Sequence, residues 1–528
     1  MKLRPHLLLP VVLAGLLAGF IYFTFRSNEP HADGQPLSYW LRELETSPDP
    51  GSDQWQRAAR VVRQIGTNGI PALLAMLQTP DSKWKSDAIG WLQETADLDL
   101  TEALGSVRSR RAATGFRLLG RSAIGALPSL TALATDTDPH IAAQALAALG
   151  EIGGAEMLPT LLTVLSNGNP AVRLQAAAAV GSLRGQGGPA VPALAALLTD
   201  PDSNLQATAA RALGEIGLNG PCAVPALTRA LTDSNFTVRI SAAMSLGAYG
   251  DQAAAALPLI RELSGQTNEF AGRFLPRTMI RVQCELRDGG VIRGPKSERK
   301  LAFVFTGHEF AEGGPTILDE LAQHGGKGSF FLTGDFLANS NHAALVQRIL
   351  NERHYLGPHS DRHLLYCAWE DRRTLVSEAD FAADLLANAA KIPAHEGEGQ
   401  RFNRYFLPAF EHYNREIFDW TRKLRWSLIN FTPGTRSNAD YTGEADKNFI
   451  SSQAIFDSIV NKEREDPNGL NGFILLLHVG SGPGRADKFH SRFGELLDYL
   501  AAKGYEFVRV DEMLGRGGFG PRGFGRRA

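Results

Sequence analysis

The stretch Leu301-Ala302-Phe303-Val304-Phe305-Thr306-Gly307-His308-Glu309 joins five consecutive apolar residues to a short polar segment. An apolar run of this length is typical of a strand that is buried on both faces. Pro315 to His324 follows with a helical pattern, and Gly328 to Thr333 is a second apolar run. This order predicts neighbouring strands of one sheet, with the polar residues after Phe305 at the strand's carboxyl end.

Strands and helices alternate from this stretch almost to the end of the chain. Further elements are predicted over Ala343 to Arg353 (helix), Trp426 to Phe431, Gly472 to His478 and Tyr505 to Val510 (strands), with two upstream strands over Thr278 to Leu286 and Val291 to Arg293. The alternation implies either a mostly parallel sheet or an α/β barrel, which we place at residues 273–514.

Histidines follow three of the predicted strands. His308 follows the first, Gly357-Pro358-His359-Ser360-Asp361-Arg362-His363 follows a second, and His478 ends a third. On a helical turn, two residues four apart share a face, and imidazole nitrogen suits zinc-like ions. The spacing alone is weak evidence, because surface or core histidines also occur at it. Three such strand ends in one domain nevertheless exceed what packing usually requires.

The order of these segments resembles the polysaccharide deacetylase (NodB-homology) family. The resemblance rests on a strand leading into Thr-Gly-His-Glu, on His-Ser-x-x-His, on Phe-Leu-Pro-Ala-Phe-Glu at residues 406–411 and on Leu-Leu-His at residues 476–478. It covers roughly Arg287 to Leu514, under half of the chain. It implies a distorted (β/α) barrel that uses a divalent metal, most often zinc, to remove acetyl groups from N-acetylated sugars or acetylated glycans.

The resemblance also implies roles for single residues. By position, His359 and His363 match the family's two metal-binding imidazoles, and His478 matches its general acid. In such a mechanism the ion polarises the acetyl carbonyl and lowers the pKa of a bound water. A carboxylate takes the proton of the water, and the histidine protonates the leaving amine or alkoxide.

The sequence departs from the family's pattern after the first strand. Thr306 and Gly307 stand where the family carries two aspartates, one a base and one a metal ligand. We expect His308 to replace the ligand, which gives a three-histidine site with an open position, and Glu309 to replace the base. The alternative is that this loop has lost the chemistry.

Three further carboxylates are candidates for a supporting role. Phe406 stands where the family usually has an arginine, and Glu411 follows shortly as a residue that supports the site or contacts the substrate. Asp440 and Asp487 lie in segments shared with a divergent branch of the family and are candidates for orienting ligating imidazoles. The interpretation that we favour for both is that they are ordinary surface or turn carboxylates.

A repeat precedes the α/β region. It is marked by Pro159, Pro192, Pro225 and Pro258, spaced by 33 residues, and by Gly150, Gly181, Gly214 and Gly247 at nearly the same spacing. Each unit predicts an Asp/Asn-rich turn, an Ala-rich helix that ends at the glycine, and a second helix opened by the proline. The period marks an α-solenoid of HEAT-like repeats, of the phycobilisome-lyase type, over residues 55–270. We expect it to bind a protein partner.

The N-terminus predicts a membrane anchor over residues 1–26. Lys2 and Arg4 precede an apolar run from Leu7 to Phe25 that is long enough to cross a bilayer as a helix. Positive charge on the short side predicts that this end stays in the cytoplasm, so that the rest faces the periplasm or the outside. A cleaved signal peptide is the alternative. Residues 27–54 are expected to form a linker and residues 515–528 a disordered Gly/Arg tail.

Composition adds few constraints. A chain of 528 residues is long enough for several domains, and its net charge of −2 gives no argument for binding nucleic acid. Its three cysteines, Cys222, Cys284 and Cys367, offer neither a disulfide framework nor a CxxC metal site.

These observations favour an anchored, extracytoplasmic metal hydrolase that deacetylates a polysaccharide. The alternative is a carbohydrate-binding barrel without turnover on a HEAT-repeat scaffold. A glycosidase ranks lower, because it needs two carboxylates about 5–10 Å apart and Glu309 and Glu411 form the only obvious pair.

Overall fold

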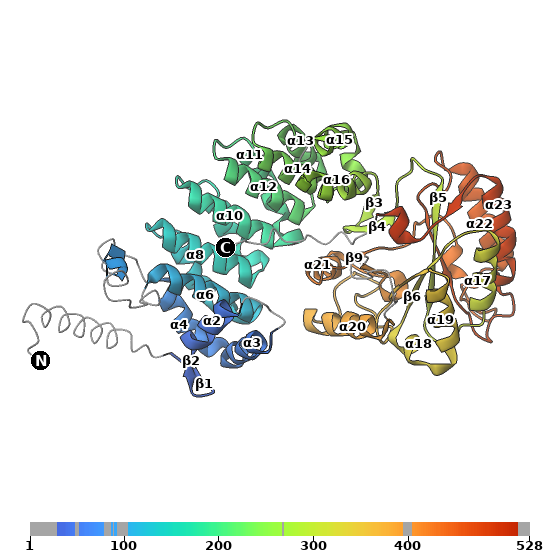
Figure 1. Cartoon of the computed structure of the whole chain (residues 1–528), viewed down its shortest axis with the longest axis horizontal. Helices are drawn as coiled ribbons and strands as arrows, with labels where there is room; N and C mark the ends of the chain where they lie inside the picture. Colours follow the sequence, from blue (N-terminus) through green and yellow to red (C-terminus); the bar gives the residue numbers. More distant parts are fainter. Residues whose placement is uncertain are drawn as a thin grey trace, which may run out of the picture. The chain divides into compact units, whose positions relative to one another are not determined.

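The computed structural model of the chain describes residues 29–47, 52–78, 86–87, 89–91, 104–266, 269–393 and 404–515. It divides into two compact units, Met1–Ile216 and Gly217–Ala528, each of which is described by itself (Figure 1). The predicted anchor and nearly all of the predicted tail lie outside the described residues. Within the described ranges, no helix is both long enough and apolar enough to cross a membrane.

The first unit is helical, as predicted for a solenoid. Its helices are α2 (Leu37–Thr46), α3 (Asp53–Ile65), α4 (Ile70–Leu77), α6 (Gly105–Leu119), α7 (Leu127–Leu133), α8 (Pro139–Ile152), α9 (Leu158–Val164), α10 (Pro170–Ser182), α11 (Val191–Leu197) and α12 (Ser203–Ile216). The longer helices α6, α8, α10 and α12 pack against one another in succession (Figure 1).

The segment expected to be a linker contains two short strands and a helix. A hairpin of β1 (His31–Ala32) and β2 (Gln35–Pro36) leads into α2, which packs against α3. The apolar face of α2, including Trp40, is buried, as its amphipathic pattern predicts. Residues 29–46 therefore extend the helical unit toward the N-terminus.

Local sequence explains where the repeat helices begin. The side chains of Asp138 and Asn169 accept hydrogen bonds from main-chain N–H groups two residues on, at the starts of α8 and α10. Pro159 and Pro192 lie in the first turns of α9 and α11. A main-chain N–H at such a position has no partner within the helix, so its absence in proline costs no hydrogen bond. Pro225 differs, because it lies inside α13 (Gly220–Ala230) of the second unit.

Three of the four repeated glycines lie inside the helices that they were predicted to end, while Gly247 directly follows the last residue of its helix, Leu246, as predicted. Gly150 and Gly181 lie within α8 and α10, while the left-handed Gly153, with φ of 70°, follows the end of α8. A Cβ atom on Gly150 would lie 3.1 Å from the Cα of Ala179, and one on Gly181 would lie 3.0 Å from the Cα of Ala212. The two glycines therefore let α8 approach α10, and α10 approach α12, at backbone distance.

The second unit contains the last repeat helices and the α/β region. Its helices are α13, α14 (Phe236–Leu246), α15 (Leu257–Gly265), α16 (Glu269–Arg281), α17 (Gly314–Gln323), α18 (Gly334–Ala338), α19 (Ala343–Asn351), α20 (Glu378–Lys391), α21 (Arg415–Lys423), α22 (Ser452–Glu465), α23 (Phe493–Ala502) and α24 (Val510–Met513), with short 3-10 turns η9 (Ala409–Glu411) and η10 (Ser437–Ala439). Its strands are β3 (Glu285–Arg287), β4 (Gly290–Arg293), β5 (Lys300–Gly307), β6 (Ser329–Leu332), β7 (Tyr355–Pro358), β8 (Tyr405–Phe406), β9 (Ser427–Leu428), β10 (Ile474–His478) and β11 (Glu506–Phe507). Most of the predicted elements form, several of them shorter than expected.

The first half of the strand predicted over Thr278 to Leu286 is instead the end of α16. Leu275, Thr278 and Val282 are buried, at the spacings of three and four that one helix face requires. The apolar and β-branched residues in this segment suggested a strand because their helical period is not obvious in so short a run.

The strands of the second unit close into a distorted barrel. β10, β5, β6 and β7 form a parallel sheet in that order, and β11 pairs with the start of β5. The N–H of Leu407, just after β8, donates to the carbonyl of Pro358 on β7, and β8 pairs in parallel with β9. A bridge joins Ile429 to Val291 on β4, and another joins the end of β4 to the residue before β10. The α/β barrel expected from the sequence therefore forms.

Alternation along β5 separates two cores. Leu301, Phe303 and Phe305 pack with apolar residues of α17 and α23, whereas Ala302 and Val304 pack in the barrel interior with β10 and β6. Figure 1 shows α17, α19, α22 and α23 on one side of β5 and β6. The same parallel strands carry His308, His359 and His478 at their carboxyl ends.

Replacing Gly181 by leucine is expected to destabilise the first unit by about 2 kcal/mol, because overpacking would force α10 away from α12. Gly168 gives a matched control, since a Cβ atom there meets nothing within 4 Å, and Gly168→Leu is expected to stay within about 0.5 kcal/mol. Urea unfolding of the full chain, followed by circular dichroism, measures both. Equal losses in the two variants would contradict the packing role of Gly181.

Candidate active site

Four histidines gather at the carboxyl edge of the barrel. His308 follows β5, His359 and His363 follow β7, and His478 ends β10. The carboxyl ends of parallel strands share one edge of a sheet or barrel, which is where such folds place reacting groups.

Three of these imidazoles form a close cluster. The rings of His308 and His363 have centroids 4.7 Å apart and planes 13° from parallel, and those of His359 and His363 lie 5.4 Å apart at 51°. The Nδ1 of His308 lies 3.2 Å from the hydroxyl of Thr333 at the end of β6. Phe410 covers another face of His363, at a centroid distance of 4.3 Å.

His359 is the most firmly held member of the cluster. Its Nδ1 lies 2.9 Å from the carbonyl of Leu407 and so carries the proton, while its main-chain N–H donates to Asn388 at 2.7 Å. Burial, reinforced by neighbouring His363, moves the pKa of His359 well below its ordinary value. The imidazole is therefore neutral, and its Nε2 carries a lone pair 3.8 Å from Glu411.

His363 is held by a strained loop and not by a helical turn. Ser360 and His363 have left-handed φ values of 75° and 54°, which non-glycine residues adopt at a cost of about 1 kcal/mol or more. Burial also lowers the pKa of His363 to about 4, with His308 adding to the effect. The two histidines of the motif thus come together through an irregular turn, which corrects the expectation of a shared helical face.

Two polar residues of α20 support this loop and were missed by the sequence analysis. The carboxylate of Asp384 accepts the N–H groups of Asp361 and Arg362 and the hydroxyl of Tyr366, and Asn388 holds His359. Asp384 and Asn388 lie four residues apart on the buried face of α20. Two polar residues in an otherwise apolar helical stripe are the signal that would have found them.

Glu411 projects a carboxyl group toward the histidines. It follows Phe410 in a turn where both residues are left-handed, with φ of 52° and 58°. Its side chain is only 13% exposed. Burial raises the pKa of Glu411 to about 7, although the charge of His478 opposes the shift. The sequence prediction that Glu411 supports the site is consistent with this position.

His478 is oriented by Asp440. One carboxylate oxygen lies 2.6 Å from Nδ1 of the imidazole, and the other accepts the main-chain N–H of His478 at 2.8 Å. Burial alone would lower the pKa of His478, but Asp440 outweighs it and the net shift is upward. Asp440 is therefore not an ordinary surface or turn carboxylate. It orients an imidazole, but that of the candidate general acid and not that of a metal ligand.

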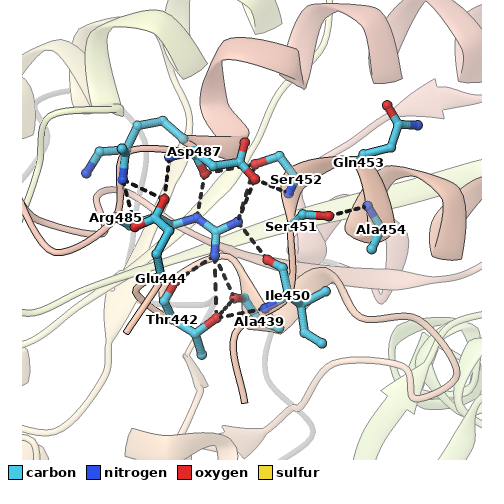
Figure 2. A network of polar contacts seen from close by, with 12 residues as sticks. Ala439, Thr442, Glu444, Ile450, Ser451, Ser452, Gln453, Ala454, Arg485 and Asp487 are labelled. Atoms are coloured by element: carbon cyan, nitrogen blue, oxygen red, sulfur yellow. Dashed lines mark hydrogen bonds and ion pairs between the residues drawn. The ribbon is translucent and has the colours of Figure 1, made fainter. Parts of the chain in front are cut away.

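Two predicted site residues form no hydrogen bond with the four histidines within the described residues. Asp487 accepts the N–H of Ser452 at 2.6 Å and lies 3.8 Å from Arg485, so it belongs to a separate polar network (Figure 2). The candidate role of Asp487 in orienting a ligating imidazole is therefore wrong. Glu309 is exposed beside His308 and makes no hydrogen bond or ion pair within the part of the chain that the structure describes.

Glu312, which the sequence analysis did not single out, ties the loop after β5 to the loop after β10. One of its carboxylate oxygens accepts the N–H groups of Ser481 and Gly482 at 3.0 and 2.8 Å and the ammonium of Lys488 at 2.6 Å. The two loops that carry His308 and His478 are therefore held together from outside the cluster.

The arrangement does not fit the predicted three-histidine metal site. Among the described residues, no three His, Cys, Asp or Glu side chains are grouped so that they would hold an ion. His308 and His363 lie nearly parallel, whereas ligating imidazoles each direct a nitrogen at one ion about 2.0–2.1 Å away. Of the three predicted donors, His359 and His308 have an Nδ1 within hydrogen-bond distance of a partner, the carbonyl of Leu407 and the hydroxyl of Thr333, as is usual for a ligating histidine.

Known proteins resemble the two parts of the chain separately. Residues 294–428 match the family described as polysaccharide deacetylase, and residues 98–180, 127–203 and 191–271 match HEAT repeats. Two peptidoglycan-N-acetylglucosamine deacetylases of Bacillus cereus are 23% identical over 221 residues (42% of this chain, 70% of the relative) and 24% identical over 220 residues (42% and 90%).

Solved structures with similar folds include a family 4 carbohydrate esterase of Bacillus subtilis, with 20% identity, a TM-score of 0.35 and coverage of 43% of this chain and 84% of that one. A CE4 family pseudoenzyme from Bacillus anthracis has 17% identity, a TM-score of 0.33 and coverage of 44% and 70%. The family match includes His308, His359, His363 and Glu411 and ends before Asp440. The chain therefore carries HEAT repeats followed by a domain of the polysaccharide deacetylase family.

Proposed function

We propose that the second unit hydrolyses acetyl groups from a polysaccharide, at a C–N or ester bond. The observation that carries the proposal is the Asp440–His478 pair, which lies at the same barrel edge as the histidine cluster and Glu411. A buried imidazole whose pKa is raised by a carboxylate is suited to deliver a proton near neutral pH.

The reaction needs one base and one acid. Water adds to the acetyl carbonyl carbon while Glu309, as proposed from the sequence, takes its proton. The C–N or C–O bond then breaks, and Nε2 of His478 gives a proton to the leaving amine or alkoxide. Because Nδ1 of His478 is held by Asp440, Nε2 is the nitrogen left for the substrate. The products are acetate and the deacetylated sugar.

An exposed aromatic track beside the cluster supports a polymeric substrate. Trp369 is 56% exposed and stacks on His412, with ring centroids 4.3 Å apart. Its edge meets Phe410, 39% exposed, which in turn contacts His363. Pyranose rings have apolar C–H faces that pack on such aromatic surfaces. We propose that a neighbouring sugar of the chain stacks on Trp369 while its acetylated neighbour lies at His363.

The proposal for the protein's location rests on the sequence. We propose that residues 1–26 anchor the protein, with both units on the periplasmic or outer side, and that the repeats bind a protein partner. In that compartment a cell-wall polysaccharide with N-acetylated sugars is the substrate we favour, in keeping with the peptidoglycan deacetylases among the relatives. A barrel that binds carbohydrate without turnover is the second candidate, favoured by the absence of the family's two aspartates.

Glu309→Gln is expected to lower kcat for acetate release by at least about 100-fold, because general-base catalysis contributes on that order. The exposed position of Glu309 leaves the fold intact. Glu506→Gln is the matched control, since Glu506 is an exposed glutamate paired at the opposite end of β5. Acetate release from an N-acetylated glycan measures both variants in the full chain.

A normal rate in Glu309→Gln combined with a large loss in Glu411→Gln would move the base to Glu411. Absence of acetate release from the parent protein, with retained binding of the glycan, would favour the binding barrel instead.

Trp369→Ala is expected to raise KM for a glycan polymer about tenfold and to leave kcat/KM for a single acetylated sugar nearly unchanged, because only the polymer reaches the track. Leu375→Ala is the control, because Leu375 is another exposed apolar side chain. Trp420 is unsuitable as a control position, because it packs against the domain core. Equal effects of Trp369→Ala on polymer and single sugar would contradict the track.

The metal requirement stays a prediction from the sequence, with zinc as the expected ion and His308, His359 and His363 as its donors. If it is correct, the purified full chain contains about one divalent ion, which the double variant His359→Ala/His363→Ala loses. His324→Ala, at the carboxyl end of α17, is the control. Elemental analysis decides between the outcomes, and full acetate release by metal-free protein would end the metal hypothesis.

A further inference from the structure

We propose that Arg485 is a positioning residue for His478, because its guanidinium fixes the main chain on both sides of Asp440. The inference rests on the proposed function, in which His478 is the general acid. Arg485 lies seven residues after His478, in the loop that follows β10, and its side chain is completely buried.

The guanidinium of Arg485 binds main-chain carbonyls from three segments (Figure 2). One terminal nitrogen donates to the carbonyl of Thr442 at 2.7 Å and to that of Ala439 at 3.4 Å. The other donates to the carbonyl of Ile450 at 2.8 Å, and Nε donates to the carbonyl of Asp487 at 2.6 Å. Every nitrogen of the group is therefore occupied.

These contacts enclose Asp440. Ala439 and Thr442 flank it, and residues 440–451 contain no helix or strand that would fix their course. Without the guanidinium, the only regular structure next to Asp440 is the short turn η10. Because both oxygens of Asp440 bind His478, a shift of this segment moves or releases the imidazole.

The other side of the network holds Arg485 itself in place. Asp487 binds the N–H of Ser452, at the start of α22, and Glu444 accepts the N–H groups of Ala486 and Asp487 (Figure 2). The segment around Asp440 and the loop around Arg485 thus fix one another. His478 ends the strand that leads into the loop of Arg485, and its imidazole is bonded to Asp440 in the other segment.

Only a guanidinium suits this position. Its planar fork presents five donors in fixed directions, whereas a lysine ammonium is a point charge with three. The nearest carboxylate oxygen, on Asp487, is 3.8 Å away, so carbonyl dipoles and not an ion pair satisfy most of the donors. Lysine would retain the positive charge and lose the bridge between Thr442 and Ile450.

The titratable groups that face His478 set the direction of the expected pH effect. They are the carboxyl groups of Asp440 and Glu411, the ring of Tyr441 at 4.9 Å and the imidazoles of His359 and His363. Asp440 holds the pKa of His478 up against burial. If Asp440 is displaced, the pKa of His478 falls, and the acid form is lost at a lower pH.

Arg485→Lys in the full chain tests the inference. We expect kcat for acetate release to fall about tenfold or more, KM to change by less than about threefold, and the alkaline limb of the kcat–pH profile to move down by about half a pH unit or more. The pKa of His478, followed by NMR of histidine-labelled protein and assigned with His478→Asn, is expected to fall by the same amount.

Arg293→Lys is the matched control. Arg293 is a second buried guanidinium that donates to main-chain carbonyls, those of Asn471 and Gly469, but it makes no bond to Ala439, Asp440 or Thr442. It is expected to cost similar thermal stability and to leave the pKa of His478 and the kcat–pH profile unchanged.

An unchanged His478 pKa in folded Arg485→Lys would overturn the inference, as would equal shifts in both variants. The NMR titration needs no turnover. A parent protein without acetate release therefore refutes the proposed function, while the titration still decides whether Arg485 positions His478.

Discussion

The barrel edge depends on one threonine, because the strands that close the barrel are short. Thr432 lies between β4 and β10, where its main-chain N–H donates to the carbonyl of Ile474 at 2.9 Å. Its hydroxyl donates to the carbonyl of Ile292 and accepts the N–H of Ile474. One residue thus bonds both neighbours, as a strand would. These bonds help to close the barrel whose strands carry the histidines at their carboxyl ends.

The sequence was sufficient to predict the strands whose residues are apolar on both faces, and the prolines that open the repeat helices. It failed where a residue's role depends on a distant neighbour. Gly150 and Gly181 were expected to end helices because glycine often does, but their conformations are helical and their role is to admit Ala179 and Ala212. No pattern within a single repeat contains that information, since the contact joins residues about 30 positions apart.

The candidate site, like the fold, could be predicted from the sequence only in part. The order of the strands predicts that His308, His359 and His478 share an edge, because parallel strands end together. The angle between the imidazole planes and the burial of Glu411 depend on left-handed turns in loops, which composition does not specify. Asp487 became a candidate because its segment is shared with a divergent branch of the family, and that resemblance does not show which neighbour its carboxylate binds in space.

The environments of the imidazoles separate their protonation states at one edge of the barrel. Burial without a close carboxylate on Nδ1 keeps His359 and His363 neutral, whereas Asp440 favours the charged form of His478. Neutral and charged imidazoles side by side are what a site needs if it is to present lone pairs at one end and a proton at the other. The separation survives only while Asp440 stays within hydrogen-bond distance, because the effect of a carboxylate falls with distance and burial works against it. The geometry of a loop without secondary structure therefore governs the chemistry of a residue on a strand.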